Sequence, residues 1–169
     1  MDGGEELMRV GILADTHDRV PAIAELVARL VEGGASLLMH AGDHCSPFSL
    51  VPVNDANIPM LGVFGRNDGD PEALAAVAAQ GVGTELYESP HSFEVSGQQI
   101  LIVHDIGEVH QRSLDKHQFV FHGNSHQAEM KTRGDTLILN PGEACGWLYG
   151  ACTAALVDLQ TREVEIIKL

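Results

Sequence analysis

Six short apolar runs in this chain each end at a small polar cluster, and this repeated arrangement constrains the fold more than any other feature. The runs are Val10–Ala14, Leu37–Met39, Ile58–Phe64, Ile100–Val103, Phe119–Phe121 and Leu137–Leu139. The clusters are 15–17, 42–44, 65–68, 104–105, 123–126 and 140–142, and carboxylate, imidazole and amide side chains recur in them. In open α/β sheets, groups at the carboxyl ends of buried strands meet in one crevice. The sequence therefore predicts a buried sheet with a polar site along its carboxyl edge.

Helical segments are expected between the first runs. Apolar residues recur at helical spacing over Val20–Val31, and the pair Gly33-Gly34 then stops the helix. This amphipathic pattern predicts a helix that packs on the sheet. The first half of the chain thus alternates strand and helix, which is typical of right-handed βαβ units.

Two further helices are expected to begin at prolines. Ser46 precedes Pro47 and Asp70 precedes Pro71, so each proline follows a residue type that caps helices. The second of these helices is expected to run to Gln80, before a glycine.

The second half of the chain has a different pattern. From Leu86 onward, short β-like segments alternate with turns, and one helix is expected near Gly107–Lys116. We expect these strands to form a second sheet stacked on the first. With 169 residues and no repeat or linker, the chain is expected to be one domain over residues 8–169, a two-sheet sandwich flanked by helices, after a flexible tail over residues 1–7.

Charge and composition limit the possible partners. The net charge is −14 and there are only ten Lys and Arg residues, which argues against a nucleic-acid backbone as the main partner. An anionic substrate would have to be held by local positive charge, such as a metal or an arginine. No apolar stretch is long enough to span a membrane, and the acidic N-terminus lacks the pattern of a signal peptide. The three cysteines have no Cys-x-x-Cys spacing, so neither a zinc knuckle nor a disulfide framework is indicated. These features predict a cytoplasmic protein, and a homo-oligomer is possible.

Some of the residues after the runs are typical metal ligands. Asp15 and His17 are two positions apart, so they share a face if the extended geometry of the strand continues, and together they suit Mn²⁺, Fe, Zn²⁺ or Ni²⁺. Asp43 can bridge two cations, while His104 follows the run Ile100–Val103 and His126 lies three residues past Gly123, after the run Phe119–Phe121. Each residue alone also fits a helix cap or a structural histidine. Their recurrence at strand ends favours a metal site.

Six segments together give a resemblance to a known family. They are Met-Arg-Val-Gly-Ile-Leu-Ala-Asp-Thr-His at 8–17, His-Ala-Gly-Asp at 40–43, Val-Phe-Gly-Arg-Asn-Asp-Gly-Asp at 63–70, Leu-Ile-Val-His-Asp at 101–105, Gly-Asn-Ser-His at 123–126 and Leu-Asn-Pro-Gly-Glu at 139–143. In these segments the chain resembles the calcineurin-like metallophosphoesterases, specifically the small single-domain YfcE-like branch.

The resemblance implies a fold, a site and an activity. The fold would be a four-layer αββα sandwich of two stacked mixed sheets, with a two-metal centre. Asp15, His17 and His126 would hold the first metal, Asp43 would bridge, and His104 would belong to the second metal. The activity would be hydrolysis of small phosphomonoesters or phosphodiesters by a water that the metal activates. Mn²⁺ is the first candidate for the metal, and Fe, Zn²⁺, Ni²⁺ and Mg²⁺ are the alternatives.

Two positions depart from the family pattern, and both concern the second metal. Arg66 stands where the family has a ligand asparagine, and Asn124 stands where it has a ligand histidine. An amide oxygen can coordinate a hard cation, but an arginine repels one. The sequence therefore predicts an intact first site and a weakened or absent second site.

Three hypotheses account for these departures. Asn67 takes the missing ligand role with help from Asn124, or the Arg66 guanidinium replaces the second cation and binds phosphate oxygens. In the third hypothesis the chain is an inactive, partner-binding module, like the retromer subunit that shares this architecture. We rank the first two above the third, because the first site is intact and Asp68, His44 and Asp105 adjoin it.

The remaining expectations concern contacts around the metals. His44 and Asn67 are expected to contact the leaving group or the substrate, and Asp68 to orient a neighbour; a histidine on the rim of a loop is the alternative for His44. Trp147 and Tyr149 would either line a rim that stacks on a base or aryl group or lie partly buried under a loop, and we expect partial burial.

Overall fold

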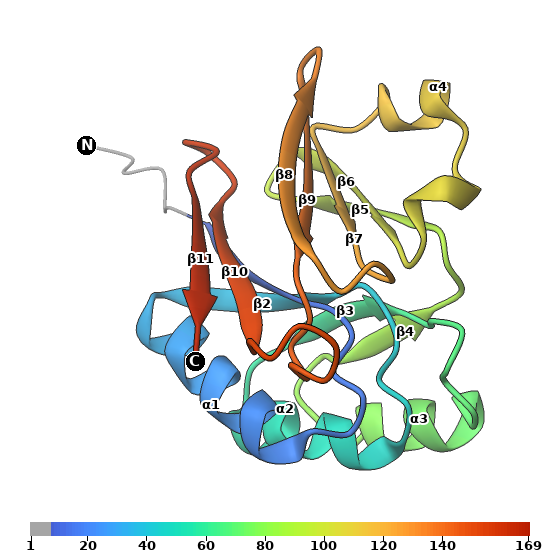
Figure 1. Cartoon of the computed structure of the whole chain (residues 1–169), viewed down its shortest axis with the longest axis vertical. Coiled ribbons are helices and arrows are strands. Elements are labelled where there is room, and N and C mark those ends of the chain that lie inside the picture. The colour runs from blue at the N-terminus through green and yellow to red at the C-terminus, as the bar shows by residue number, and fades with distance from the viewer. Residues whose placement is uncertain (1–7) are drawn as a thin grey trace.

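Two stacked sheets form the centre of the computed structural model, which describes residues 8–169 (Figure 1). The first sheet has the order β11-β10-β1-β2-β3-β4, with strands Arg9–Leu13 (β1), Ala35–His40 (β2), Met60–Val63 (β3), Glu85–Tyr87 (β4), Thr153–Asp158 (β10) and Val164–Lys168 (β11). The second has the order β5-β6-β7-β9-β8, with strands His91–Val95 (β5), Gln98–Val103 (β6), Phe119–His122 (β7), Ala128–Arg133 (β8) and Thr136–Pro141 (β9). The expected tail over residues 1–7 lies outside the described part.

The six apolar runs all form strands, as predicted. Strands β1, β2 and β3 are parallel in the first sheet, and strands β6, β7 and β9 are parallel in the second. Parallel strands end at the same edge, so each sheet presents three polar clusters along its carboxyl edge. The two edges meet, because the amide of Ala144, after β9 of the second sheet, donates to the carbonyl of Ala14, after β1 of the first.

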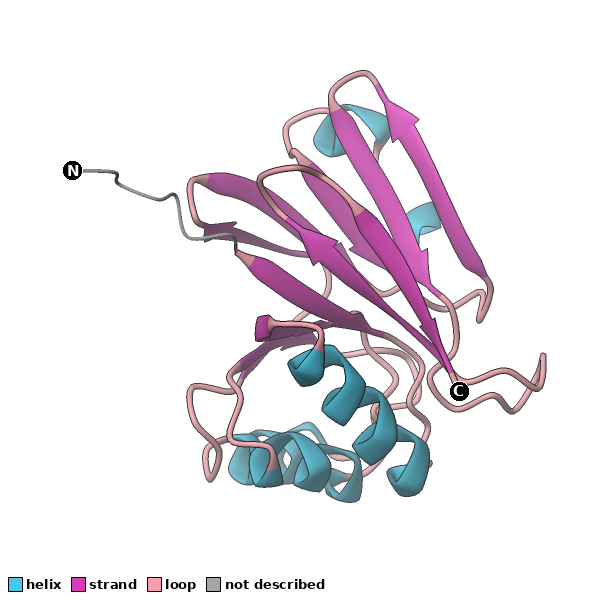
Figure 2. Cartoon of the chain, turned by 90° about the vertical axis from the view of Figure 1, so that its left-hand side faces the viewer, coloured by secondary structure: helices cyan, strands magenta, loops and turns pink. Residues whose placement is uncertain are grey.

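Helices lie outside both sheets and complete the four layers. Helices Val20–Glu32 (α1), Val51–Asp55 (α2) and Pro71–Ala78 (α3) and the 3₁₀ turn Pro47–Leu50 (η1) lie on the outer face of the first sheet (Figure 2). The outer face of the second sheet carries the 3₁₀ turn Ile106–Glu108 (η2) and the short helix Gln111–Leu114 (α4). The αββα arrangement that the resemblance implied is therefore present.

Burial of apolar side chains explains this layering. One core, which includes Leu26, Leu30 and Leu38, fills the space between the helices and the first sheet. A second core, which includes Phe119 and Phe121, fills the space between the two sheets. Strand residues contribute alternately to the two cores, because successive side chains of a strand point to opposite faces. Both faces of the parallel strands are thus covered, which fits their nearly continuous apolar sequences.

The predictions for helix ends were partly wrong. The Asp70 side chain caps α3 by accepting from the amide of Ala73 at 2.9 Å, as expected, but the helix ends at Ala78 rather than Gln80. The Ser46 side chain does not cap the turn that begins at Pro47. Its hydroxyl instead donates to Asp18 Oδ1 at 2.7 Å, because Asp18 lies close enough to compete for it.

Two expectations about the second half of the chain were also wrong. Strands β4, β10 and β11 join the first sheet rather than the second, and β10 lies between β1 and β11, with every residue buried. The single helix expected over Gly107–Lys116 is two short segments, because Val109 has an extended backbone that interrupts them. Over residues 8–169, no helix has the length and apolar character required to cross a membrane.

Candidate metal centre

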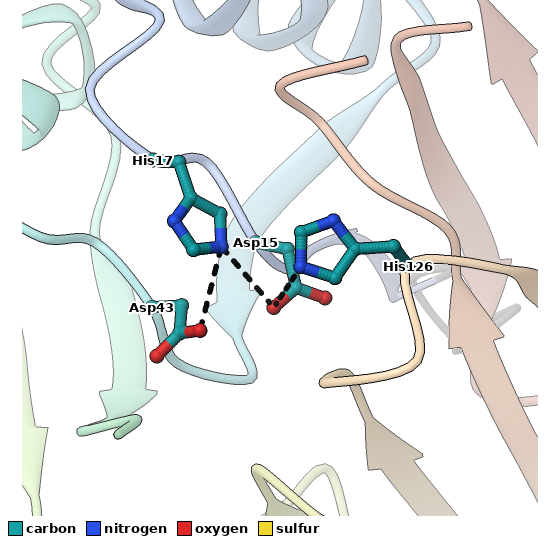
Figure 3. A group of neighbouring side chains, drawn as sticks. All are labelled: Asp15, His17, Asp43 and His126. Carbon is teal, nitrogen blue, oxygen red and sulfur yellow. Dashed lines mark ion pairs between the residues drawn. The ribbon is translucent and has the colours of Figure 1, made fainter. Parts of the chain in front are cut away.

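Four predicted ligands converge where the carboxyl edges of the two sheets meet (Figure 3). His17 Nε2 lies 3.4 Å from Asp43 Oδ2 and 3.9 Å from Asp15 Oδ1. His126 Nε2 lies 3.6 Å from the same Asp15 oxygen. One ligand atom from each of the four residues falls within 4.8 Å of the others, which is the spacing of donors around a single ion.

The loops at this centre have an unusual backbone conformation. Asp15, His17, Asp43 and His126 all have positive φ, at 51°, 37°, 62° and 62°. The prediction that Asp15 and His17 share a face through extended geometry is therefore wrong. The chain leaves β1 at Leu13, and the two side chains converge through left-handed turns. Non-glycine residues in this conformation are strained, and such residues cluster at functional sites.

Each carboxylate has one oxygen held by the backbone and the other turned toward the centre. Asp15 Oδ2 accepts from the amide of Asn124 at 3.0 Å, and Asp43 Oδ1 accepts from the amide of Asn67 at 2.9 Å. Asp15 Oδ1 and Asp43 Oδ2 are the oxygens that face the imidazoles. The backbone thus fixes the orientation of both carboxylates before any ligand binds.

Several buried polar atoms of the centre lack a hydrogen bond. Asp15 Oδ1, His17 Nε2 and His104 Nε2 are inaccessible to solvent and have no such partner in the part of the chain that the structure describes. An unsatisfied buried polar group is costly, and a cation held by the four converging residues would satisfy Asp15 Oδ1 and His17 Nε2. Two carboxylates and two imidazoles are also the donors that Mn²⁺, Fe and Zn²⁺ accept. The residues present therefore fit a divalent metal.

The electrostatics of the two carboxylates differ. Burial raises the pKa of Asp15 to about 6, although the neighbouring imidazoles oppose this shift. Burial acts in the same direction on Asp43, but the nearby imidazoles of His104 and His17 and the hydrogen bonds from Asn67 outweigh it and hold the pKa of Asp43 well below its usual range. Asp43 is therefore a permanent anion at the centre, and a bound cation would favour ionised Asp15 as well.

Further side chains hold the two imidazole ligands. Glu143 Oε2 lies 2.8 Å from His126 Nδ1, so this carboxylate fixes the ring and leaves Nε2 facing Asp15. Such carboxylate–histidine pairs orient metal ligands. The sequence alone does not assign this role to Glu143, although Glu143 follows a strand run just as the candidate ligands do. Cys45 Sγ lies 3.2 Å from His17 Nδ1, and burial raises the pKa of this thiol to about 12, so Cys45 supports a ligand as a neutral thiol.

The second metal position is incompletely built. His104 Nε2 lies 3.4 Å from Asp43 Oδ2, on the oxygen that His17 also approaches. Asn124 reaches the centre through its backbone amide, which donates to Asp15 Oδ2 at 3.0 Å. Arg66 turns away: its guanidinium pairs with Asp105 at 2.5 Å and with Glu108 at 2.8 Å and is exposed.

The loop after β3 supports Asp43 instead. The Asn67 side chain donates to Asp43 Oδ2 at 2.8 Å, in addition to the backbone contact of Asn67. Asp68 accepts from the amides of Cys45 and Gly65, at 2.7 and 2.6 Å, and so joins the two loops. Asn67, one residue after the arginine, thus holds Asp43 through both its backbone and its side chain.

His44 does not lie where sequence reasoning placed it. We expected a substrate or leaving-group contact, with a rim histidine as the alternative, but the side chain is buried. Its ring stacks on His40 with a centroid separation of 3.7 Å, and Nε2 lies 3.2 Å from the carbonyl of Val63. These contacts turn the imidazole into the protein interior, away from a substrate at the metal centre.

We predict that Gly65→Ala disrupts the centre, because an added Cβ would lie 2.2 Å from Asp43 Oδ1 and 2.3 Å from its backbone nitrogen. Gly69→Ala is the matched control, since nothing lies within 4 Å of a Cβ at that position of the same loop. Manganese titration by calorimetry should give at least about 10-fold weaker binding for Gly65→Ala and unchanged binding for Gly69→Ala. Equal affinities would show that Asp43 is not held as described.

Comparison with known proteins agrees with this geometry. The phosphodiesterase MJ0936 of Methanocaldococcus jannaschii is 27% identical over 168 residues, which cover 96% of this chain and 99% of that protein. A solved structure of an archaeal phosphodiesterase, also 27% identical, covers 96% of this chain and 100% of its own with a TM-score of 0.85. The phosphoesterase YfcE from E. coli is 14% identical, with coverage of 96% and 98% and a TM-score of 0.65, and so supports the fold alone. The model of the calcineurin-like phosphoesterase superfamily domain matches residues 8–162, and the chain belongs to that superfamily.

Proposed function

We propose that the protein is a metal-dependent phosphodiesterase that hydrolyses small phosphodiesters. The observation that carries the proposal is the convergence of Asp15, His17, Asp43 and His126, with buried donor atoms that have no other partner. The 27% identity to a phosphodiesterase over 96% of the chain supports the same activity. An inactive partner-binding module is not favoured, because such a protein would have no need for strained, fixed ligand residues.

The cation would be held by Asp15, His17, Asp43 and His126, and we expect Mn²⁺, with Fe, Zn²⁺, Ni²⁺ or Mg²⁺ as alternatives. When bound, a divalent cation lowers the pKa of water toward neutrality and offsets negative charge on the phosphoryl oxygens. The three free thiols and the absence of a membrane-spanning helix in residues 8–169 are compatible with the cytoplasm, where we expect the protein to act.

The chain supplies orientation and hydrogen bonds around this cation. Asn124 and Asn67 hold the carboxylates through their backbone amides, and Glu143 fixes the His126 ring. We propose that the Asn67 side chain and His104 Nε2, both beside Asp43 Oδ2, face the substrate or a weakly held second cation. This is the first of the three hypotheses for the departures from the family pattern. It is supported by the position of Arg66, which pairs with Asp105 and Glu108.

The charges near the site favour a diester over a monoester. A phosphodiester has one negative charge, whereas a phosphomonoester has close to two at neutral pH. Arg66, the cation nearest in sequence to Asn67, is already neutralised by two carboxylates, and the chain as a whole has a net charge of −14. With one firmly held cation, the site therefore has little positive charge for a dianion.

We predict that Asp43→Asn lowers kcat for bis(p-nitrophenyl) phosphate by at least about 100-fold at saturating Mn²⁺, because the amide removes the permanent anion of the centre. Asp115→Asn is the control, since Asp115 forms an exposed ion pair with Arg133 outside the centre. Release of p-nitrophenolate measures both rates. Wild-type protein without hydrolysis of this diester, or Asp43→Asn with full activity, would contradict the proposal.

A second prediction concerns the departures at the second metal position. The double variant Arg66→Asn with Asn124→His restores the ligand types of the family, so it should bind more Mn²⁺ per chain and hydrolyse the diester faster than the wild type. Metal content by atomic absorption and kcat at fixed Mn²⁺ are the measurements. If neither value rises, then Arg66 and Asn124 are not the cause of a weakened second site.

A further inference from the structure

Three consecutive large apolar side chains are exposed beside the metal centre. Trp147, Leu148 and Tyr149 are 60%, 67% and 58% exposed, in the segment that joins β9 to β10. Figure 1 shows this segment curling at the carboxyl edges of the sheets. The expectation that Trp147 and Tyr149 lie partly buried under a loop is therefore wrong. We call residues 146–150 the aromatic loop.

The aromatic loop is held in one shape by the carboxylate of Glu143. This buried side chain accepts from the amide of Tyr149 at 2.6 Å and from the amide of Leu148 at 3.0 Å. The loop also closes on itself, because the amide of Gly150 donates to the carbonyl of Gly146 at 3.2 Å. Both glycines have positive φ, so the chain turns sharply at each end. The apolar side chains are thus presented on a fixed backbone rather than on a loose one.

The same contacts place the loop next to two metal ligands. Glu143 also holds the His126 ring at 2.8 Å, so one carboxylate orients both a ligand and the loop. Trp147 Nε1 donates to the carbonyl of His17 at 3.3 Å. The Arg19 guanidinium lies 4.6 Å from the centre of the indole ring and holds the ring from one side. The exposed aromatic surface therefore borders the centre on the side of His17 and His126.

We infer that the aromatic loop binds a flat aromatic ester group of the substrate, so that the protein selects aryl or nucleoside phosphodiesters. This inference rests on the proposed function. Exposed apolar side chains in succession are unfavourable in water, and their position at a reactive centre gives them a ligand to contact. Fixed tryptophan and tyrosine side chains stack on aromatic groups with little loss of entropy. The acidic protein also cannot rely on charge to attract its substrate.

Two ligands that differ in one group test the inference. Methyl phenylphosphonate and methyl methylphosphonate are monoanions that mimic the diester, and only the first has an aromatic ring. Trp147 is the single tryptophan of the chain, so its fluorescence reports contact with the loop directly. The phenyl compound should change this fluorescence and bind about 10-fold more tightly than the methyl compound, as expected for one stacked ring. Equal affinities, or no fluorescence change with the phenyl compound, would overturn the inference.

Variants identify the residues responsible. The preference for the ring is the inhibition constant of the methyl compound divided by that of the phenyl compound, both measured against hydrolysis of bis(p-nitrophenyl) phosphate at saturating Mn²⁺. Trp147→Ala and Tyr149→Ala should each lower this ratio by at least about 3-fold. Trp147→Phe should retain most of the preference, which a merely structural role for the indole would not predict. Val82→Ala is the control, because Val82 is 51% exposed and lies before the amino end of β4, at the opposite edge of the sheet.

The outcomes separate this inference from the proposed function. If the wild type hydrolyses the diester but the ratio is the same in every variant, the loop does not recognise aromatic groups and the inference fails alone. The loop would then be a surface for a partner protein. If the wild type hydrolyses no diester at all with Mn²⁺, the proposed function fails.

Discussion

The fixed carboxylate of Asp43 is the group on which the metal centre depends. Its Oδ1 is held by the amide of Asn67, and its Oδ2 lies 3.4 Å from the rings of both His17 and His104. Its backbone carbonyl accepts from the amide of His17 as well. This one residue therefore joins the loops that follow β1, β3 and β6. Such close approach requires glycine at position 65, where any side chain would collide with Asp43.

The strain of the centre is balanced by the two apolar cores beneath it. Four ligand residues hold left-handed backbone conformations, and each such conformation costs on the order of 1–3 kcal/mol. The parallel strands that carry these loops are buried on both faces, as the full burial of Phe121 and Leu38 illustrates. The loops are also linked by backbone hydrogen bonds, such as that from Asp15 to Gly42. A rigid scaffold can thus hold ligands in positions that the loops alone would not adopt.

The strands and the convergence of Asp15, His17, Asp43 and His126 were predictable because they depend on local patterns. Apolar runs form buried strands, and polar residues at their ends meet when the strands are parallel. The position of β10 in the first sheet was not predictable, because the sequence of this strand does not indicate which of the two sheets it joins. The burial of His44 depends on stacking with His40. The exposure of Trp147 depends on the hydrogen bond by which Glu143 holds the neighbouring Leu148 amide. Contacts of this kind join residues through the tertiary fold, so no local pattern reveals them.

We propose that the departures at Arg66 and Asn124 leave the second metal position weaker than the first. The first position has two carboxylates and two imidazoles, whereas the second has the shared Asp43, His104 and amides. The most direct test is anomalous scattering at the manganese edge from a crystal grown with Mn²⁺. We predict one strong peak coordinated by Asp15, His17, Asp43 and His126, and a weaker peak or none between Asp43 and His104. Four side chains that point apart around an empty pocket would contradict it.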